Sequence, residues 1–172
     1  MNTIDAIMTR RSVRSYTSEP VTKEQIDILL RAGMQAPTTI NNRDWAFIVV
    51  DDRDIMNKII ANQEGNAEML KDAPVAIVVC GDLDLAIKPD VEYWVQDCSA
   101  ATENILLAAH DLGLGAVWLG TYPVMNRVEG MKRIFNLPEN IVPMAVISIG
   151  HPARQLPKAD RYEPKKIHYN KW

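Results

Sequence analysis

The chain has 172 residues, a hydrophobic content of 47% and a formal net charge of −3, values that suit a single globular domain. The slightly acidic balance argues against a dedicated nucleic-acid binder. No stretch has the length and apolar character of a membrane span or a secretory signal, so we expect a cytoplasmic protein with no membrane partner. Cys80 and Cys98 lack metal-type spacing and are expected to be buried thiols.

Amphipathic helical patterns alternate with short apolar strands along the first half of the chain. The predicted elements are helices at 3–9 and from Thr22 to about 35, a strand at 45–50, a helix capped by Asp51 and Asp52, a helical turn at 69–72 and a strand at 74–80. Thr22 and Gln25 form a capping box. The apolar run that ends at Cys80 is typical of a strand buried on both faces.

A long helix, predicted from Val91 to Leu112, organises the second half and leads into a strand at 116–119. Apolar side chains surround this helix, so both of its sides need cover from other helices or from a second copy of the chain. A helix at about 126–135 and a strand at 142–149 follow. Four strongly apolar strands predict a small helix-covered sheet, α+β or α/β, rather than a large doubly wound one.

Residues 151–172 are expected to form an extended arm without a long helix, because they include Pro152, Pro157 and Pro164. It ends in aromatic residues, including Tyr169 and Trp172, whose apolar surface favours docking over exposure to water. We therefore expect an arm that lies over a partner subunit.

Arginines gather immediately after the first helix, at Arg10, Arg11 and Arg14, with Ser12 between them. A guanidinium group matches phosphate oxygens bidentately, and a serine hydroxyl adds a further donor. These residues could therefore bind a phosphate group. They could equally be a solvated helix end whose arginines complement the helix dipole, and both interpretations stay open on these residues alone.

The loop at 36–45 is rich in side chains that can hydrogen-bond a polar ligand, among them Thr38, Thr39 and Asn41. Ordinary turn chemistry also explains such residues, although loops often carry binding groups. The glycines near 113–120 do not form a dinucleotide fingerprint, and the three histidines have no partners in hydrolase or metal spacing. If the protein is an enzyme, a cofactor is therefore expected to carry the chemistry.

In combination and in this order, these motifs resemble those of short flavin-dependent nitroreductases. The resemblance covers nearly the whole chain and rests on residues 10–14, 36–41, 45–50, 65–66, 113–120 and 149–152. It implies an α+β homodimer with FMN at two interface sites. Each chain, 1–172, would be one FMN-binding domain whose segment 151–172 is an arm exchanged between subunits.

The resemblance also implies roles for individual residues. The phosphate would be held by Arg10, Arg11 and Ser12 from one side and by Arg161 with Lys158 from the other. Arg14 would lie near the pyrimidine edge of the flavin, where a cation stabilises the reduced ring, and Asn66 would hydrogen-bond the isoalloxazine. The remaining contacts would come from Pro37, Thr38, Thr39 and Asn41, partly of the second subunit, and from Trp118, Leu119 and Gly120 behind the ring.

The implied activity is the reduction of a nitroaromatic, quinone or similar small electron-poor acceptor by NADH or NADPH. The nicotinamide and the acceptor would bind in turn at the flavin, and neither a catalytic side chain nor a metal would be needed. Two alternatives share the fold: a flavoenzyme with a narrow reaction, such as reductive dehalogenation or flavin breakdown, and a flavin-binding protein that does not turn over. The sequence departs from the family pattern twice. Arg43-Asp44-Trp45 replaces the usual Gln-Pro-Trp, and Leu119 stands where a glutamate often precedes the glycine.

Overall fold

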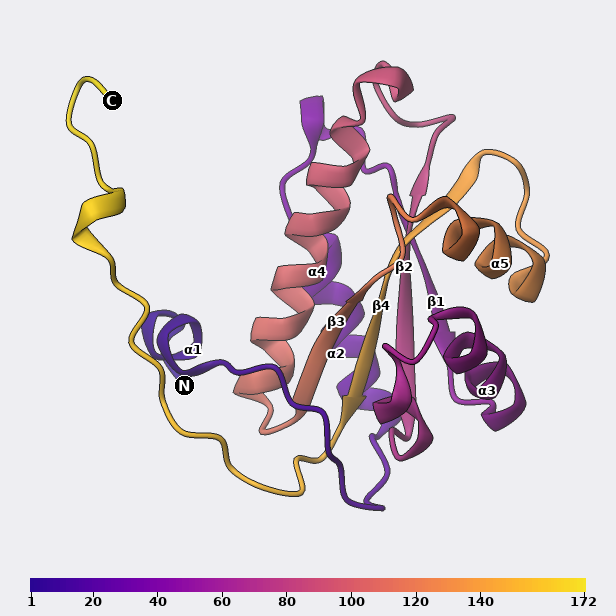
Figure 1. Ribbon diagram of the computed structural model, residues 1–172, viewed down its shortest axis with the longest axis horizontal. Coiled ribbons are helices and arrows are strands. Elements are labelled where there is room, and N and C mark those ends of the chain that lie inside the picture. The colour runs from indigo at the N-terminus through magenta and orange to yellow at the C-terminus, as the bar shows by residue number, and fades with distance from the viewer.

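The computed structural model describes all residues, 1–172, and contains one four-stranded sheet between helical layers (Figure 1). The strands are β1 (Trp45–Val50), β2 (Val75–Asp82), β3 (Gly115–Gly120) and β4 (Ile141–Gly150). Their order in the sheet is β1-β2-β4-β3, and every neighbouring pair is antiparallel. An antiparallel sheet with separate helices decides between the two predicted classes in favour of α+β.

Five α-helices surround the sheet. They are α1 (Thr3–Thr9), α2 (Lys23–Met34), α3 (Arg53–Asn62), α4 (Tyr93–Asp111) and α5 (Met125–Phe135). Figure 1 shows α2 and α4 on one side of the sheet and α3 and α5 on the other, with α1 set apart from the sheet. None of the helices combines the length and the apolar character needed to cross a membrane.

The side chains of β2 alternate between two separate cores. Ile77 and Val79 pack on the side of α2 and α4, whereas Val78 and Cys80 pack on the side of α3 and α5. All four are fully buried, which confirms the prediction of a strand covered on both faces. Cys80 and Cys98 are free and buried, as expected. Burial raises the pKa of the Cys80 thiol to about 12, so it remains protonated at neutral pH.

The predicted capping box is present, since Thr22 accepts from Gln25 N and Gln25 accepts from Thr22 N. The prediction for the start of the long helix is wrong by two residues. Val91 belongs to a short 3₁₀ turn, and the φ angle of Glu92 is 60°, which separates this turn from α4. Helix α2 packs against α4 and so supplies part of the cover that the second side of α4 requires.

The N-terminal segment and the chain after β4 meet beside the sheet. Ser12 forms a parallel bridge with Ala116 of β3, and Tyr16 forms an antiparallel bridge with Pro152. The arm then leaves the body of the molecule and passes α1 (Figure 1). Tyr169 and Trp172 are exposed, so the expected docking of the arm is not made within a single chain.

Candidate functional site

The segment after α1 runs in extended conformation past the start of β3. Val13 N donates to Ala116 O at 3.0 Å, and this approach is possible because residue 115 is glycine. A Cβ atom at Gly115 would lie 2.6 Å from Cγ1 of Val13, closer than packed atoms approach. The close contact fixes the segment that carries Arg11, Ser12 and Arg14.

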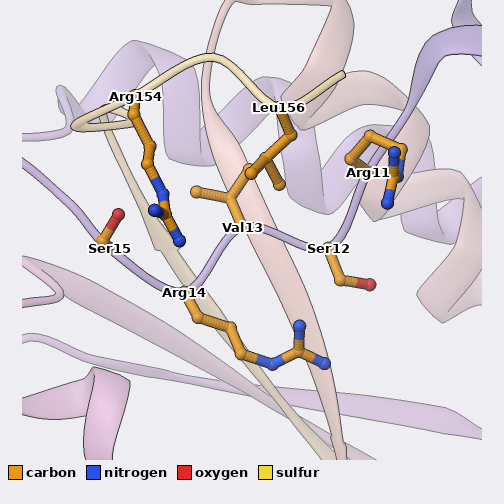
Figure 2. Close-up of a pocket in the computed structure, with 7 residues that line it drawn as sticks. All are labelled: Arg11, Ser12, Val13, Arg14, Ser15, Arg154 and Leu156. Carbon is orange, nitrogen blue, oxygen red and sulfur yellow. The ribbon is translucent and has the colours of Figure 1, made fainter. Parts of the chain in front are cut away.

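These three residues line a cavity of about 280 Å³, together with Arg154 from the arm. Figure 2 shows the side chains of Ser12 and Arg14 extending to the same side of the segment, while Arg154 approaches from the arm opposite. Segments that are 140 residues apart in the sequence, near positions 14 and 154, thus contribute cations to one place. Such an arrangement attracts an anion.

A second cavity, of about 270 Å³, is lined by Arg10, Arg11 and Arg161, with Asp160 the one carboxylate among its lining residues. The Nε atoms of Arg10 and Arg11 are buried without a hydrogen-bond partner. Arg10 Nε lies 3.3 Å from a carboxylate oxygen of Glu103, but not in hydrogen-bonding geometry. Three guanidinium groups thus meet at this cavity, although Arg10 is also paired with Glu103 and Arg11 with the arm, and such a cluster attracts an anion.

The arm is tied to this region by Arg11, which donates a hydrogen bond to the carbonyl of Pro157. The next residue, Lys158, lines a third cavity, of about 420 Å³, with Arg11 and Arg154. Arg11 thus borders all three cavities, and Lys158 and Arg161 line different ones. The structure brings the predicted cations from the two ends of the chain together around Arg11.

A fourth cavity, the β3 cavity, has a volume of about 450 Å³ and lies at the end of β3. Five of its lining residues are predicted site residues: Arg14, Asn66, Trp118, Leu119 and Gly120. Arg14 also lines the 280 Å³ cavity, so this one side chain borders both spaces. A Cβ atom added to Gly120 would meet no atom within 4 Å, so the backbone there faces open space. A flat ligand could lie against the end of this strand.

The polar residues around this cavity are held by hydrogen bonds from several elements. Gln63, at the end of α3, donates to Thr121 Oγ1 at 3.0 Å, and Asn66 donates to Gln63 O at 3.2 Å. Arg127, in the first turn of α5, pairs with Glu64 at 3.2 Å. Gln63 Oε1 and Arg127 Nε are buried without partners. One free acceptor and one free donor thus belong to residues that line the cavity.

Sequence reasoning missed four of the polar or aromatic residues at these cavities: Gln63, Tyr122, Arg127 and Arg154. Gln63 is part of the polar break that contains Asn66, and Arg154 is part of the basic arm, so nearby signals existed for both. Arg127 lies within an amphipathic helix and belongs to no motif. Only the packing of α5 against α3 brings it to the end of β3.

The remaining predicted residues, Pro37, Thr38, Thr39 and Asn41, do not line the cavities that contain Arg14. Their loop lies beside α4, where the N–H and hydroxyl of Thr39 both donate to Asp97, at 3.0 and 3.2 Å. Thr38 Oγ1 accepts from Arg43 N at 3.1 Å. Within one chain, these four residues and the β3 cavity are separate.

The sequence profile of the Nitroreductase family matches residues 7–64 and 56–151 of the chain. The chain belongs to the nitroreductase family. Among curated relatives, a protein of Methanothermobacter thermautotrophicus named "Putative NADH dehydrogenase/NAD(P)H nitroreductase" is 49% identical over 100% of this chain and 88% of its own length. The matched residues include the arginine segment, residues 10–14, and all residues that line the β3 cavity. The match ends at residue 151, where the arm begins.

Solved structures of nitroreductases share the fold over the full length. A protein of Parabacteroides distasonis with the same name is 42% identical, with a TM-score of 0.94 and 100% of both chains covered. An FMN-dependent nitroreductase of Clostridium difficile is 32% identical, with a TM-score of 0.90 over 98% of this chain and 99% of its own. The α+β architecture described above is therefore the nitroreductase fold.

Proposed function

We propose that the chain is an FMN-dependent oxidoreductase that takes reducing equivalents from NADH or NADPH and passes them to a nitroaromatic, quinone or similar electron-poor acceptor. The observation that carries the proposal is the meeting of Arg14 and Arg154, cations from the two ends of the chain, at a cavity without a carboxylate, next to the open cavity at the end of β3 that Arg14 also lines. The FMN-dependent relative of the same fold supports the choice of cofactor. The two electron partners would bind alternately at one face of the ring.

The donors of the site suit FMN. Its phosphate needs charge-assisted donors, and the guanidinium groups of Arg10 and Arg11, with Ser12, Lys158 and Arg161 in the cavities that Arg11 borders, could supply them. The flavin ring needs a flat apolar surface and hydrogen-bonding groups at its edge. Trp118, Leu119 and Gly120 could provide the surface, and Arg14 and Asn66 the polar groups.

When bound, FMN supplies the hydride and electron transfer, and the side chains supply binding, orientation and charge. Arg14, which forms no ion pair, places a positive charge at this cavity, whereas Arg127 is paired with Glu64; a cation there favours a ligand that becomes more negative as it gains electrons. Tyr122 donates to Glu92, and this hydrogen bond raises the pKa of the phenol. Tyr122 therefore remains protonated at neutral pH and does not act as a base.

We further propose that the working unit is a homodimer. Helix α1 exposes Ile4, Ile7 and Met8, and the arm exposes Tyr169 and Trp172, all of which a second copy could cover. The second copy would also place its Pro37, Thr38, Thr39 and Asn41 at the cavity of the first. This arrangement gives a role to loop residues that, within one chain, line neither of the cavities that contain Arg14.

Absorption spectra of the purified protein test the proposal. We expect a yellow protein whose visible absorbance is lost when NADH or NADPH is added without oxygen, and returns when a nitroaromatic or quinone is added. Replacement of Arg10 and Ser12 by alanine should release the flavin. A bound flavin that neither nicotinamide bleaches would instead identify a binding protein without turnover, and a failure to bind added FMN would refute the proposal altogether.

A further inference from the structure

Two carboxyl groups are buried against each other between the loop that follows α2 and helix α4. Asp44 is fully buried, and Asp97 is 6% exposed. The two groups are close enough that the charge of Asp97 raises the pKa of Asp44. Asp97 also accepts from both the N–H and the hydroxyl of Thr39, whereas Asp44 accepts from Asn42 at 3.1 Å. Two neighbouring buried carboxylates would repel, which favours a proton on one of them.

The surroundings contain no cation that could neutralise the pair. Its titratable neighbours are Cys98 of α4 and Cys80 of β2, and burial raises the pKa of both thiols. Asp82 of β2 donates its N–H to Asp44 O at 2.7 Å but directs its carboxylate to Asn140. Burial first, and the charge of Asp97 second, raise the pKa of Asp44. The oxygen Oδ1 of Asp44 has no donor, which also favours a proton on this carboxyl group.

The loop held by the pair has a strained backbone. Ile40, Asn41 and Arg43 have φ angles of 47, 60 and 54°, in the left-handed region that residues with a side chain rarely adopt. Such conformations persist only where surrounding contacts impose them. Ile40 is also 76% exposed at the tip of the loop, so its own packing does not stabilise the conformation. Both polar groups of Thr39, the residue before it, are bound by Asp97.

We propose that Asp97 and Asp44 are positioning residues for flavin binding: they share one proton, and while they share it Asp97 holds Thr39 and thereby the strained loop in its binding conformation. The inference rests on the proposed function, in which this loop contacts the flavin in the second subunit. It also refines the role of Thr39. Because its N–H and hydroxyl are occupied by Asp97, Thr39 anchors the loop, and Thr38 and Asn41 remain to contact the ring.

Ionisation of Asp44 would place two buried negative charges close together and weaken the anchor. The native chain binds this proton more tightly than the unfolded chain, so a rise in pH through the native pKa of Asp44 should loosen the loop and lower the free energy of unfolding.

Amide hydrogen exchange of Thr39 in the flavin-free protein tests the anchor from about pH 4 to pH 8. The measured quantity is the protection factor, which is corrected for the intrinsic pH dependence of exchange. We expect the protection of Thr39 to fall about tenfold or more in the wild type as Asp44 ionises. Asp44→Asn, which can donate to Asp97 but cannot ionise, should keep it constant. Asp51→Asn, which removes an exposed carboxylate, should show the wild-type profile.

FMN affinity over the same pH range tests the link to binding. The FMN phosphate itself ionises at about pH 6, so the wild type is compared with Asp44→Asn at each pH. We expect the ratio of the wild-type dissociation constant to that of Asp44→Asn to rise about tenfold with pH, and the dissociation constant of Asp97→Ala to be raised at every pH. If the protection of Thr39 stays constant in the wild type, or falls equally in Asp44→Asn, the proposed role of the two aspartates in holding Thr39 is refuted. Falling protection with an FMN affinity ratio between wild type and Asp44→Asn that does not change with pH would refute its role in binding. The exchange measurement needs no flavin, so it stands even if the proposed function fails.

Discussion

Gly115 and Gly120, both on β3, are expected to affect different properties of the protein. Gly115 is required by packing, because a Cβ atom there would lie 2.6 Å from Val13. Gly120 faces open space at the β3 cavity, and its φ angle is not in the left-handed region. The first position should therefore control the stability of the chain, and the second should control the space that is available to a ligand.

Alanine substitutions at these glycines form a matched pair. Gly115→Ala should lower the free energy of unfolding by about 1–3 kcal/mol, the usual cost of overpacking. Gly120→Ala should change it by less than about 0.5 kcal/mol but weaken FMN binding about tenfold, because the methyl group enters the cavity. Denaturant unfolding of the flavin-free proteins and FMN titration check both values. Unchanged FMN affinity in Gly120→Ala would contradict the assignment of the cavity.

Arg127 is expected to influence which acceptors react. It is the second cation in the lining of the β3 cavity, and although it pairs with Glu64, its Nε has no partner. Arg127→Met should lower kcat/KM for 4-nitrobenzoate about tenfold, and much less for the neutral 4-nitrobenzyl alcohol, because a charge-assisted hydrogen bond is lost. Lys23→Met, which removes an exposed cation at the start of α2, is the control. Equal losses with both acceptors would contradict this role.

At the scale of elements, local sequence signals predicted most of the architecture. The capping box at Thr22 and the apolar run of β2 depend on neighbouring residues alone, so they could be recognised without tertiary structure. The start of α4 could not, because the left-handed residue Glu92 is neither glycine nor asparagine and leaves no signal. Strand order and antiparallel pairing likewise depend on contacts between distant segments.

The capping box of α2 should affect stability without affecting the site. Thr22→Ala removes the acceptor for Gln25 N and should lower the free energy of unfolding by about 1 kcal/mol. FMN affinity should remain unchanged, since neither Thr22 nor Gln25 lines the cavities that contain Arg14. Unfolding should be measured without flavin, because a bound ligand adds its own stabilisation. A large change in FMN affinity would connect α2 to the site and contradict this separation.

For the whole molecule, the site could be predicted only in part. The arginine segment and the basic arm were recognisable as charged clusters, and the structure brings both to Arg11. Gln63 and Arg127 were not, because they join the β3 cavity only through the packing of α3 and α5. The loop at Thr39 carries polar groups whose partner, Asp97, is 58 residues away, so its anchor could not be inferred from local sequence.

The homodimer is a property of the whole molecule and can be tested in solution. Analytical ultracentrifugation of the full chain should give a particle of two chains, because α1 and the arm leave apolar side chains uncovered. A variant that ends at Tyr162 lacks Tyr169 and Trp172 and should dissociate at a protein concentration at least about tenfold higher. A full-length chain that remains a monomer at every concentration would remove the proposed second half of the flavin site.

The central claim is that cations from both ends of the chain bind one phosphate group. The most direct test compares the affinities of the protein for FMN and for riboflavin, which lacks the phosphate. The wild type should bind FMN at least about 100-fold more tightly, and Arg161→Met should lose about tenfold or more in FMN affinity while its riboflavin affinity stays the same. Equal affinities of the wild type for the two flavins, or equal losses for both in Arg161→Met, would contradict the account.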